Sequence, residues 1–150
     1  MSLATATAAP DRRAVGTLFR ILAAGIVLTA VHYTDNYLYF DDYPQPASLR
    51  RWQVYTGWLV LTAVGILGYR LYKSGHSAAA CVCLVVYSYT GTSSLGHYLY
   101  GSWSEFSAKQ HVFILVDGAA GIAVLAFVVW SLTRPRRGTG GSTVAGTGTG

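Results

Sequence analysis

The sequence contains few charged residues. Only 11% of its 150 residues are Asp, Glu, Lys or Arg, whereas 52% are hydrophobic and the mean hydropathy is +0.37. Soluble domains average about 25% charged residues, so this composition excludes an ordinary soluble globule. The charged residues are so few that we expect them mainly at the ends of apolar segments and in the connections between these segments.

Cysteine and recognisable active-site motifs are also scarce. The only two cysteines are Cys81 and Cys83. On a helix this spacing turns the two side chains about 200° apart, which excludes a disulfide between them. We interpret both as small packing residues. The sequence has no phosphate-binding loop before a helix, no nucleophile elbow and no HExxH or HxxxH spacing.

Four long apolar segments dominate what is present, at residues 15–33, 52–72, 78–100 and 110–132. A helix of roughly 18 residues or more crosses about 30 Å of hydrocarbon and satisfies its own backbone hydrogen bonds there. We therefore predict an all-α, four-transmembrane-helix bundle with up-down-up-down topology over residues 15–132. The first segment has no small-residue cleavage site after it, so we interpret it as a retained span rather than a signal peptide.

Basic residues are distributed unequally between the ends of these segments. Eight lie at ends that would share one side of the membrane: Arg12, Arg13, Arg20, Arg70, Lys73, Arg134, Arg136 and Arg137. Only Arg50, Arg51 and Lys109 lie at the other ends. The positive-inside rule then predicts a plasma-membrane or inner-membrane protein with both termini in the cytoplasm. The net charge of +5 is thus a topology signal and not evidence for a nucleic-acid partner.

The ends of the chain and its two halves complete the predicted organisation. Residues 1–14 and the basic, Gly/Thr-rich residues 133–150 are expected to be disordered cytoplasmic tails. YLY occurs at 37–39 and 98–100, which is consistent with two related helical hairpins, although aromatic residues recur at membrane interfaces in any case. The expected partners are the lipid bilayer and, because small residues let helices pack closely, a second copy or another membrane subunit.

Histidines gather near the predicted outer face. His32 and His97 lie at the ends of two segments that run outward, and His111 begins a segment that runs back. Three imidazoles and a carboxylate match the ligands of a zinc or non-haem iron centre, so these histidines are our candidate metal ligands. A haem held by two of them is a variant. On an ideal helix His111 points about 100° to 120° away from Asp117, which weakens a site that uses both.

Carboxylates and hydroxyls accompany the histidines. Three carboxylates are candidates for a general base or for a group that orients a ligand: Asp35, Glu105 and Asp117. Asp117 lies about two helical turns, roughly 9 Å, below the outer end of its segment. Helical spacing places Gln110, Ile114, Asp117, Gly121 and Val124 on one face, which we expect to be interior. A polar stripe in the third segment includes Thr90 and Ser93 and leads to His97. The candidate cofactor-binding residues are Thr90, Ser93 and Tyr98.

Three functions remain open from these residues, and the sequence does not decide whether the protein is an enzyme. The polar cluster can bind a metal ion, haem or a small apolar ligand. Alternatively, it is an interhelical hydrogen-bond network within a structural or accessory subunit. The third possibility is transport of protons or small solutes through Asp117, which would need a polar chain across the membrane.

Overall fold

The structure, a computed structural model, describes residues 11–134. It consists of four long helices: α1 (Arg12–Leu38), α2 (Arg51–Lys73), α3 (Ser77–Thr92) and α4 (Ala108–Thr133). Short 3-10 helices follow α1 and α3: η1 (Phe40–Asp42), η2 (Ser93–Leu99) and η3 (Trp103–Glu105). Four helical segments, with α3 and η2 taken together, are long and apolar enough to cross a membrane. The predicted all-α four-helix bundle is therefore confirmed.

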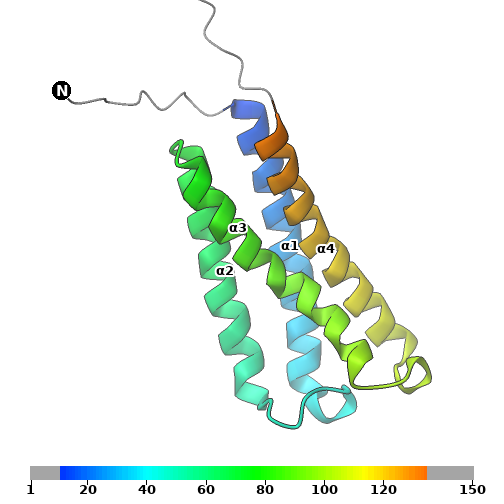
Figure 1. Ribbon diagram of the computed structural model, residues 1–150. Coiled ribbons are helices and arrows are strands. Elements are labelled where there is room, and N and C mark those ends of the chain that lie inside the picture. The colour runs from blue at the N-terminus through cyan, green and yellow to red at the C-terminus, as the bar shows by residue number, and fades with distance from the viewer. Residues whose placement is uncertain (1–10, 135–150) are drawn as a thin grey trace, which may run out of the picture.

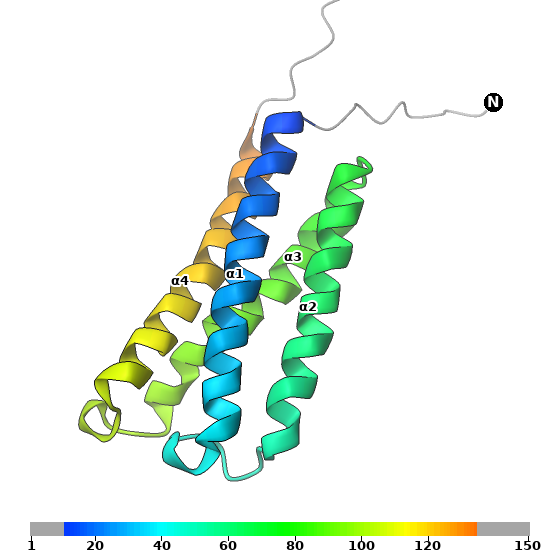
Figure 2. The same ribbon diagram turned by 180° about the vertical axis from the view of Figure 1, so that it is seen from behind.

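Successive helices run in opposite directions (Figures 1 and 2). We call the end that holds Asp11, the α2–α3 turn and Arg134 the terminal end. The opposite end, with the connections at residues 39–50 and 100–107, is the loop end. Both views show that α3 starts beside α2 at the terminal end and reaches the loop end beside α4. This crossing leaves the loop-end halves of α2 and α3 apart, with α1 between them.

The first helix begins earlier than the apolar segment that predicts it. Asp11 is its N-cap, because the side-chain oxygen of Asp11 accepts a hydrogen bond from the backbone N–H of Arg13 at 2.9 Å. Residues 12–14, predicted to belong to the tail, are therefore helical, and Thr133 likewise belongs to α4. The remainder of the predicted tails, residues 1–10 and 135–150, lies outside the described residues.

Apolar packing fills the half of the bundle nearer the terminal end. The buried cluster comprises Leu18, Leu22, Cys81, Leu84, Tyr87, Val124, Phe127 and Val128. Tyr87 lies against Gly65 of α2, where a Cβ atom would be only 2.6 Å from the tyrosine ring. Small residues thus admit an aromatic ring between helices. Cys81 and Cys83 are both free, as their spacing predicts.

Helices α3 and α4 touch through their backbones at Gly91 and Gly121. A Cβ atom on Gly91 would lie 2.2 Å from the Asp117 carbonyl oxygen, and one on Gly121 would lie 2.6 Å from the Ser88 carbonyl oxygen. Only glycine permits so close an approach. This crossing places the residues that follow Gly91 directly beside the deepest carboxylate of the chain.

The regular α-helix of α3 ends earlier than predicted. The apolar pattern predicts helix to residue 100, but from Ser93 to Leu99 the chain forms the tighter 3-10 helix η2. Ser93, Ser94 and Gly96 are poor helix formers, and serine hydroxyls compete for backbone carbonyls. The Ser93 hydroxyl, for example, lies 3.5 Å from the Thr90 carbonyl oxygen. The tighter winding changes the direction in which Ser94 and His97 point.

Candidate functional site

A histidine and an aspartate form a buried pair between α1 and α4. His32 Nδ1 lies 2.8 Å from Asp117 Oδ2, and the two side chains are 2% and 1% exposed. Ser94 of η2 donates a hydrogen bond to the same carboxylate oxygen at 3.1 Å. The predicted interior face of α4 is confirmed, since Gln110, Ile114, Asp117, Gly121 and Val124 are all buried.

Burial favours a form of this pair in which the charges balance. His32 is the only basic side chain that pairs with Asp117 within residues 11–134. A lone carboxylate at this depth costs several kcal/mol, so the imidazole balances its charge, either as an imidazolium beside a carboxylate or as an imidazole beside a carboxylic acid. In both forms one hydrogen lies between Nδ1 and Oδ2 and a second remains on His32 Nε2. In both forms His32 Nε2, which does not contact Asp117, is therefore a hydrogen-bond donor.

His97 is held in place by hydrogen bonds on both sides of its ring. Its Nδ1 lies 2.8 Å from the Pro44 carbonyl oxygen, and its Nε2 lies 3.2 Å from Asn36 Nδ2. A carbonyl can only accept, so Nδ1 donates, and Nε2 accepts from the Asn36 amide group. His97 therefore ties the α1–α2 connection to η2 and α1.

Tyr43 closes this region from the loop end. The ring is 3% exposed, and its centroid lies 5.7 Å from that of His32 and 5.2 Å from that of His97. Its hydroxyl donates to Asp35 Oδ2 at 2.8 Å, and Lys109 donates to the other oxygen of Asp35 at 2.7 Å. Burial, and then the hydrogen bond to Asp35, raise the pKa of the Tyr43 phenol above its ordinary value. The linker thus covers the two histidines.

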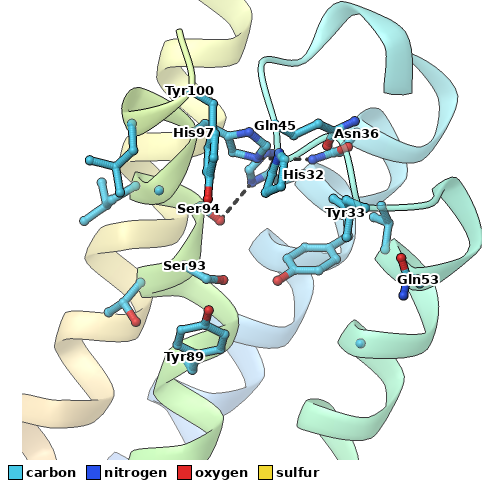
Figure 3. A pocket seen from close by; sticks show the side chains of 18 of the residues that line it. His32, Tyr33, Asn36, Gln45, Gln53, Tyr89, Ser93, Ser94, His97 and Tyr100 are labelled. Atoms are coloured by element: carbon cyan, nitrogen blue, oxygen red, sulfur yellow. Dashed lines mark hydrogen bonds between the residues drawn. The ribbon is translucent and has the colours of Figure 1, made fainter.

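A cavity of about 730 Å³ opens beside the pair. Residues of α1 form its back wall, α2 forms one side, α3 and η2 form the other, and Gln45, Pro46 and Leu49 cover it at the loop end. Figure 3 shows His32, Asn36, Gln45 and His97 gathered at one end of this cavity. Three lining residues of α3, η2 and the turn after it are exposed: Tyr89 (63%), Leu99 (83%) and Tyr100 (54%). Figure 3 shows Tyr100 beside His97 and Tyr89 farther along α3. The cavity is therefore not enclosed along the wall that α3 and η2 form.

His111 lies apart from the other two histidines. Its Nδ1 is 2.9 Å from the Tyr98 hydroxyl, and its ring stacks on Trp103 with a centroid distance of 3.9 Å. Phe106 completes this aromatic cluster over the α3–α4 connection. As the helical angle predicts, His111 does not face Asp117.

The structure therefore does not assemble the predicted metal site from His32, His97 and His111. In the part of the chain that is described, no three His, Cys, Asp or Glu side chains lie close enough to hold one metal ion. The physical reason is local: η2 turns His97 towards Pro44, and the start of α4 directs His111 to Trp103. Both nitrogens of His97 form hydrogen bonds within the protein.

The remaining candidate residues have different surroundings. Asp35 pairs with Tyr43 and Lys109, whereas Glu105 is exposed and caps η3 through hydrogen bonds from Ser102 at 3.2 and 3.0 Å. Among the candidate cofactor-binding residues, Ser93 lines the cavity, whereas Thr90 is buried elsewhere and Tyr98 belongs to the His111 cluster.

Sequence reasoning overlooked some residues of the polar end. Gln45 lies in a proline-flanked linker with no periodic pattern, so nothing local indicates where its amide points. Asn36 had a signal, because it follows His32 by four residues and shares its helix face. Ser94 follows Ser93 in the polar stripe, and in the 3-10 helix η2 its hydroxyl donates to Asp117.

Comparison of the chain with protein-family models, with curated proteins and with solved structures finds no match.

Proposed function

We propose that this multi-pass membrane protein binds a small, largely apolar molecule in the cavity beside His32. The observation that carries the proposal is the Nε2 atom of His32: it is buried, it belongs to a residue that lines the cavity, and it has no hydrogen-bond partner among the described residues. A buried polar atom without a partner costs about 1–3 kcal/mol. A ligand that bonds to Nε2 removes this cost.

The position of the opening supports entry from the bilayer. Tyr43 and the linker cover the histidines at the loop end, whereas the exposed lining residue Tyr89 lies on α3, within the third candidate membrane span. An exposed side chain inside a membrane span, such as Tyr89, faces lipid or a neighbouring membrane protein. A molecule dissolved in the bilayer therefore reaches the cavity without crossing the polar roof. Ligand sites of a few hundred Å³ with a few convergent polar groups are the usual form of small-molecule site.

A purely structural network explains less of what is observed. It accounts for His97, whose two nitrogens are both bonded, and for Asp35, whose two oxygens are both bonded. It does not account for His32, which brings a buried nitrogen without a partner to a cavity. That difference favours ligand binding over an accessory role.

The distribution of charge supports the predicted orientation. Arg12, Arg13, Arg70, Lys73 and Arg134 lie near the terminal end, whereas Asp35, Asp41, Asp42 and Glu105 lie near the loop end together with Arg50, Arg51 and Lys109. By the positive-inside rule the terminal end is cytoplasmic and the ligand site lies in the outer leaflet.

Filling the cavity tests the proposal. Gly57 of α2 lines the cavity, and a Cβ atom there meets nothing within 4 Å, so Gly57→Leu can occupy the space with no backbone contact to overcome. Gly16→Leu is the matched control, because Gly16 of α1 has equally open surroundings and does not line the cavity. Binding is measured for tritiated decanamide, decan-1-ol and methyl decanoate on protein in nanodiscs, by scintillation proximity.

The proposal expects at least one of the three probes to bind saturably to the wild type and to Gly16→Leu. Gly57→Leu should reduce that binding at least tenfold. Absence of saturable binding for all three probes, or undiminished binding to Gly57→Leu, would contradict a ligand site in this cavity.

A further inference from the structure

Three residues that line the cavity carry a buried polar atom without a hydrogen-bond partner, which gives one donor and two acceptors. Seven buried side-chain atoms lack a hydrogen-bond partner within residues 11–134. Three of them, His32 Nε2, Asn36 Oδ1 and Gln45 Oε1, belong to residues that line the cavity. The other four belong to Thr62, Tyr87, Thr90 and Asp117, none of which lines it. The unpartnered atoms at the cavity therefore form a set with a defined hydrogen-bonding character.

The donor of this set is His32 Nε2. Burial favours a pair without net charge, and both proton arrangements of such a pair leave a hydrogen on Nε2. An occupant of the cavity must therefore supply an acceptor oxygen or nitrogen to this position.

The first acceptor is Asn36 Oδ1, and its identity follows from its neighbours. The Pro44 carbonyl obliges His97 Nδ1 to donate, so the neutral ring presents a lone pair at Nε2. The atom of Asn36 that meets this lone pair, 3.2 Å away, must be the amide nitrogen. The carbonyl oxygen of Asn36 is then the atom left without a partner.

The second acceptor is Gln45 Oε1. The amide nitrogen of Gln45 donates to the Phe40 carbonyl oxygen at 2.7 Å. A carbonyl cannot donate in return, so the amide of Gln45 cannot be reversed, and its oxygen remains free. Figure 3 shows Asn36 and Gln45 at the same end of the cavity as His32.

We propose that the cavity selects a neutral primary carboxamide head on an apolar body. A primary carboxamide has one carbonyl oxygen, which accepts from His32 Nε2, and two N–H hydrogens, which donate to Asn36 Oδ1 and Gln45 Oε1. An alcohol or an ester cannot satisfy all three atoms, and a charged head would add an unbalanced charge to a neutral buried site. This inference rests on the proposed function, since it names the class of molecule that the same cavity takes.

Matched decyl probes test the inference, because decanamide and methyl decanoate share the apolar chain and differ in the head. The ester can accept from His32 but has no hydrogen for Asn36 or Gln45. Leaving two buried acceptors unpaired should weaken its binding to the wild type by about 10- to 100-fold relative to decanamide. Decan-1-ol, with a single hydroxyl, should also bind more weakly than decanamide.

Gln45→Met separates a direct contact from a structural effect. It keeps a side chain of similar length and removes the acceptor, so it should weaken decanamide binding about tenfold. Methyl decanoate binding should change by less than twofold, which also shows that the variant is folded. Equal loss of both probes would mean that Gln45 acts through the fold, and no loss of either would mean that it does not meet the head group.

The outcomes for the two proposals differ. Equal affinity of the three probes for the wild type, with loss of all three in Gly57→Leu, overturns carboxamide selection and leaves the ligand cavity standing. Tighter binding of methyl decanoate than of decanamide also overturns the carboxamide assignment. No saturable binding of any probe overturns both proposals.

Discussion

The close approach of α3 and α4 at Gly91 makes the structure vulnerable to a single methyl group. In Gly91→Ala the new Cβ would lie 2.2 Å from the Asp117 carbonyl oxygen and 2.8 Å from the Gly121 nitrogen, whereas ordinary contacts begin near 3.4 Å. The two helices must therefore separate by roughly 1 Å at the crossing. Both neighbours are backbone atoms, which cannot rotate away as a side chain can.

The cost of this separation follows from overpacking. Extra methyl groups in a packed interior cost about 1–3 kcal/mol and occasionally more, and the rigid neighbours at Gly91 place the effect at about 3 kcal/mol. The helix itself gains about 0.5–1 kcal/mol when alanine replaces glycine, which offsets only part of the cost. The site is affected as well, because Asp117 shifts away from its hydrogen bond with Ser94.

Unfolding in detergent, followed by helical circular dichroism, measures the effect. We expect a loss of about 5–10 °C in Tm for Gly91→Ala. Gly16→Ala is the matched control, since a Cβ there meets nothing within 4 Å and should leave stability unchanged or slightly higher. If Gly91→Ala unfolds at the same temperature as Gly16→Ala, the backbone contact between α3 and α4 does not exist as described.

Three further predictions concern the pair, the roof and the orientation. Asp117→Leu alone should cost about 3–5 kcal/mol of unfolding free energy, because it leaves His32 buried without its partner. His32→Phe together with Asp117→Leu should recover most of this loss, because neither member of the buried pair is then left alone. Equal loss in the single and double variants would contradict the pairing. The pKa of the Tyr43 phenol is raised in the folded protein, so the unfolded chain loses this proton first as the pH rises. The free energy of unfolding should therefore fall above about pH 10, by up to about 1.4 kcal/mol per pH unit. The fall should be less steep in Tyr43→Phe. In a cysteine-free background, an impermeant maleimide should label Ser104→Cys on intact cells but Ser74→Cys only after permeabilisation, and the reverse pattern would invert the assigned topology.

Hydropathy predicts the four membrane-spanning helices, and helical periodicity predicts which face of a helix lies inside the bundle. The four segments had to be helical in lipid, and the interior face of α4 followed from the spacing of Gln110, Ile114 and Asp117. The same geometry predicted that His111 turns away from Asp117. These are properties of single helices, and they are visible without knowledge of any neighbour.

The pattern of a single helix does not predict which side chains of different helices contact each other. His32 and His97 lie at the same end of the bundle, yet only His32 pairs with Asp117. The choice depends on the rotation of α1 and on the 3-10 winding of η2, which the periodicity of a single helix does not reveal. The position of Gln45 depends on a linker without periodicity. For these reasons the three-histidine centre was predicted, and the histidine–aspartate pair beside a cavity was not.

Photolabelling of the cavity tests the central claim most directly. An alkyl diazirine carrying whichever of the three head groups binds most tightly is irradiated with the protein in nanodiscs, and the labelled residues are mapped by mass spectrometry. The account predicts labels on the cavity walls, within residues 53–61 of α2 and 89–100 of α3 and η2, and their loss with excess unlabelled probe. Labels spread over outward-facing residues such as Val60, Val112 and Val129, unaffected by competition, would contradict it.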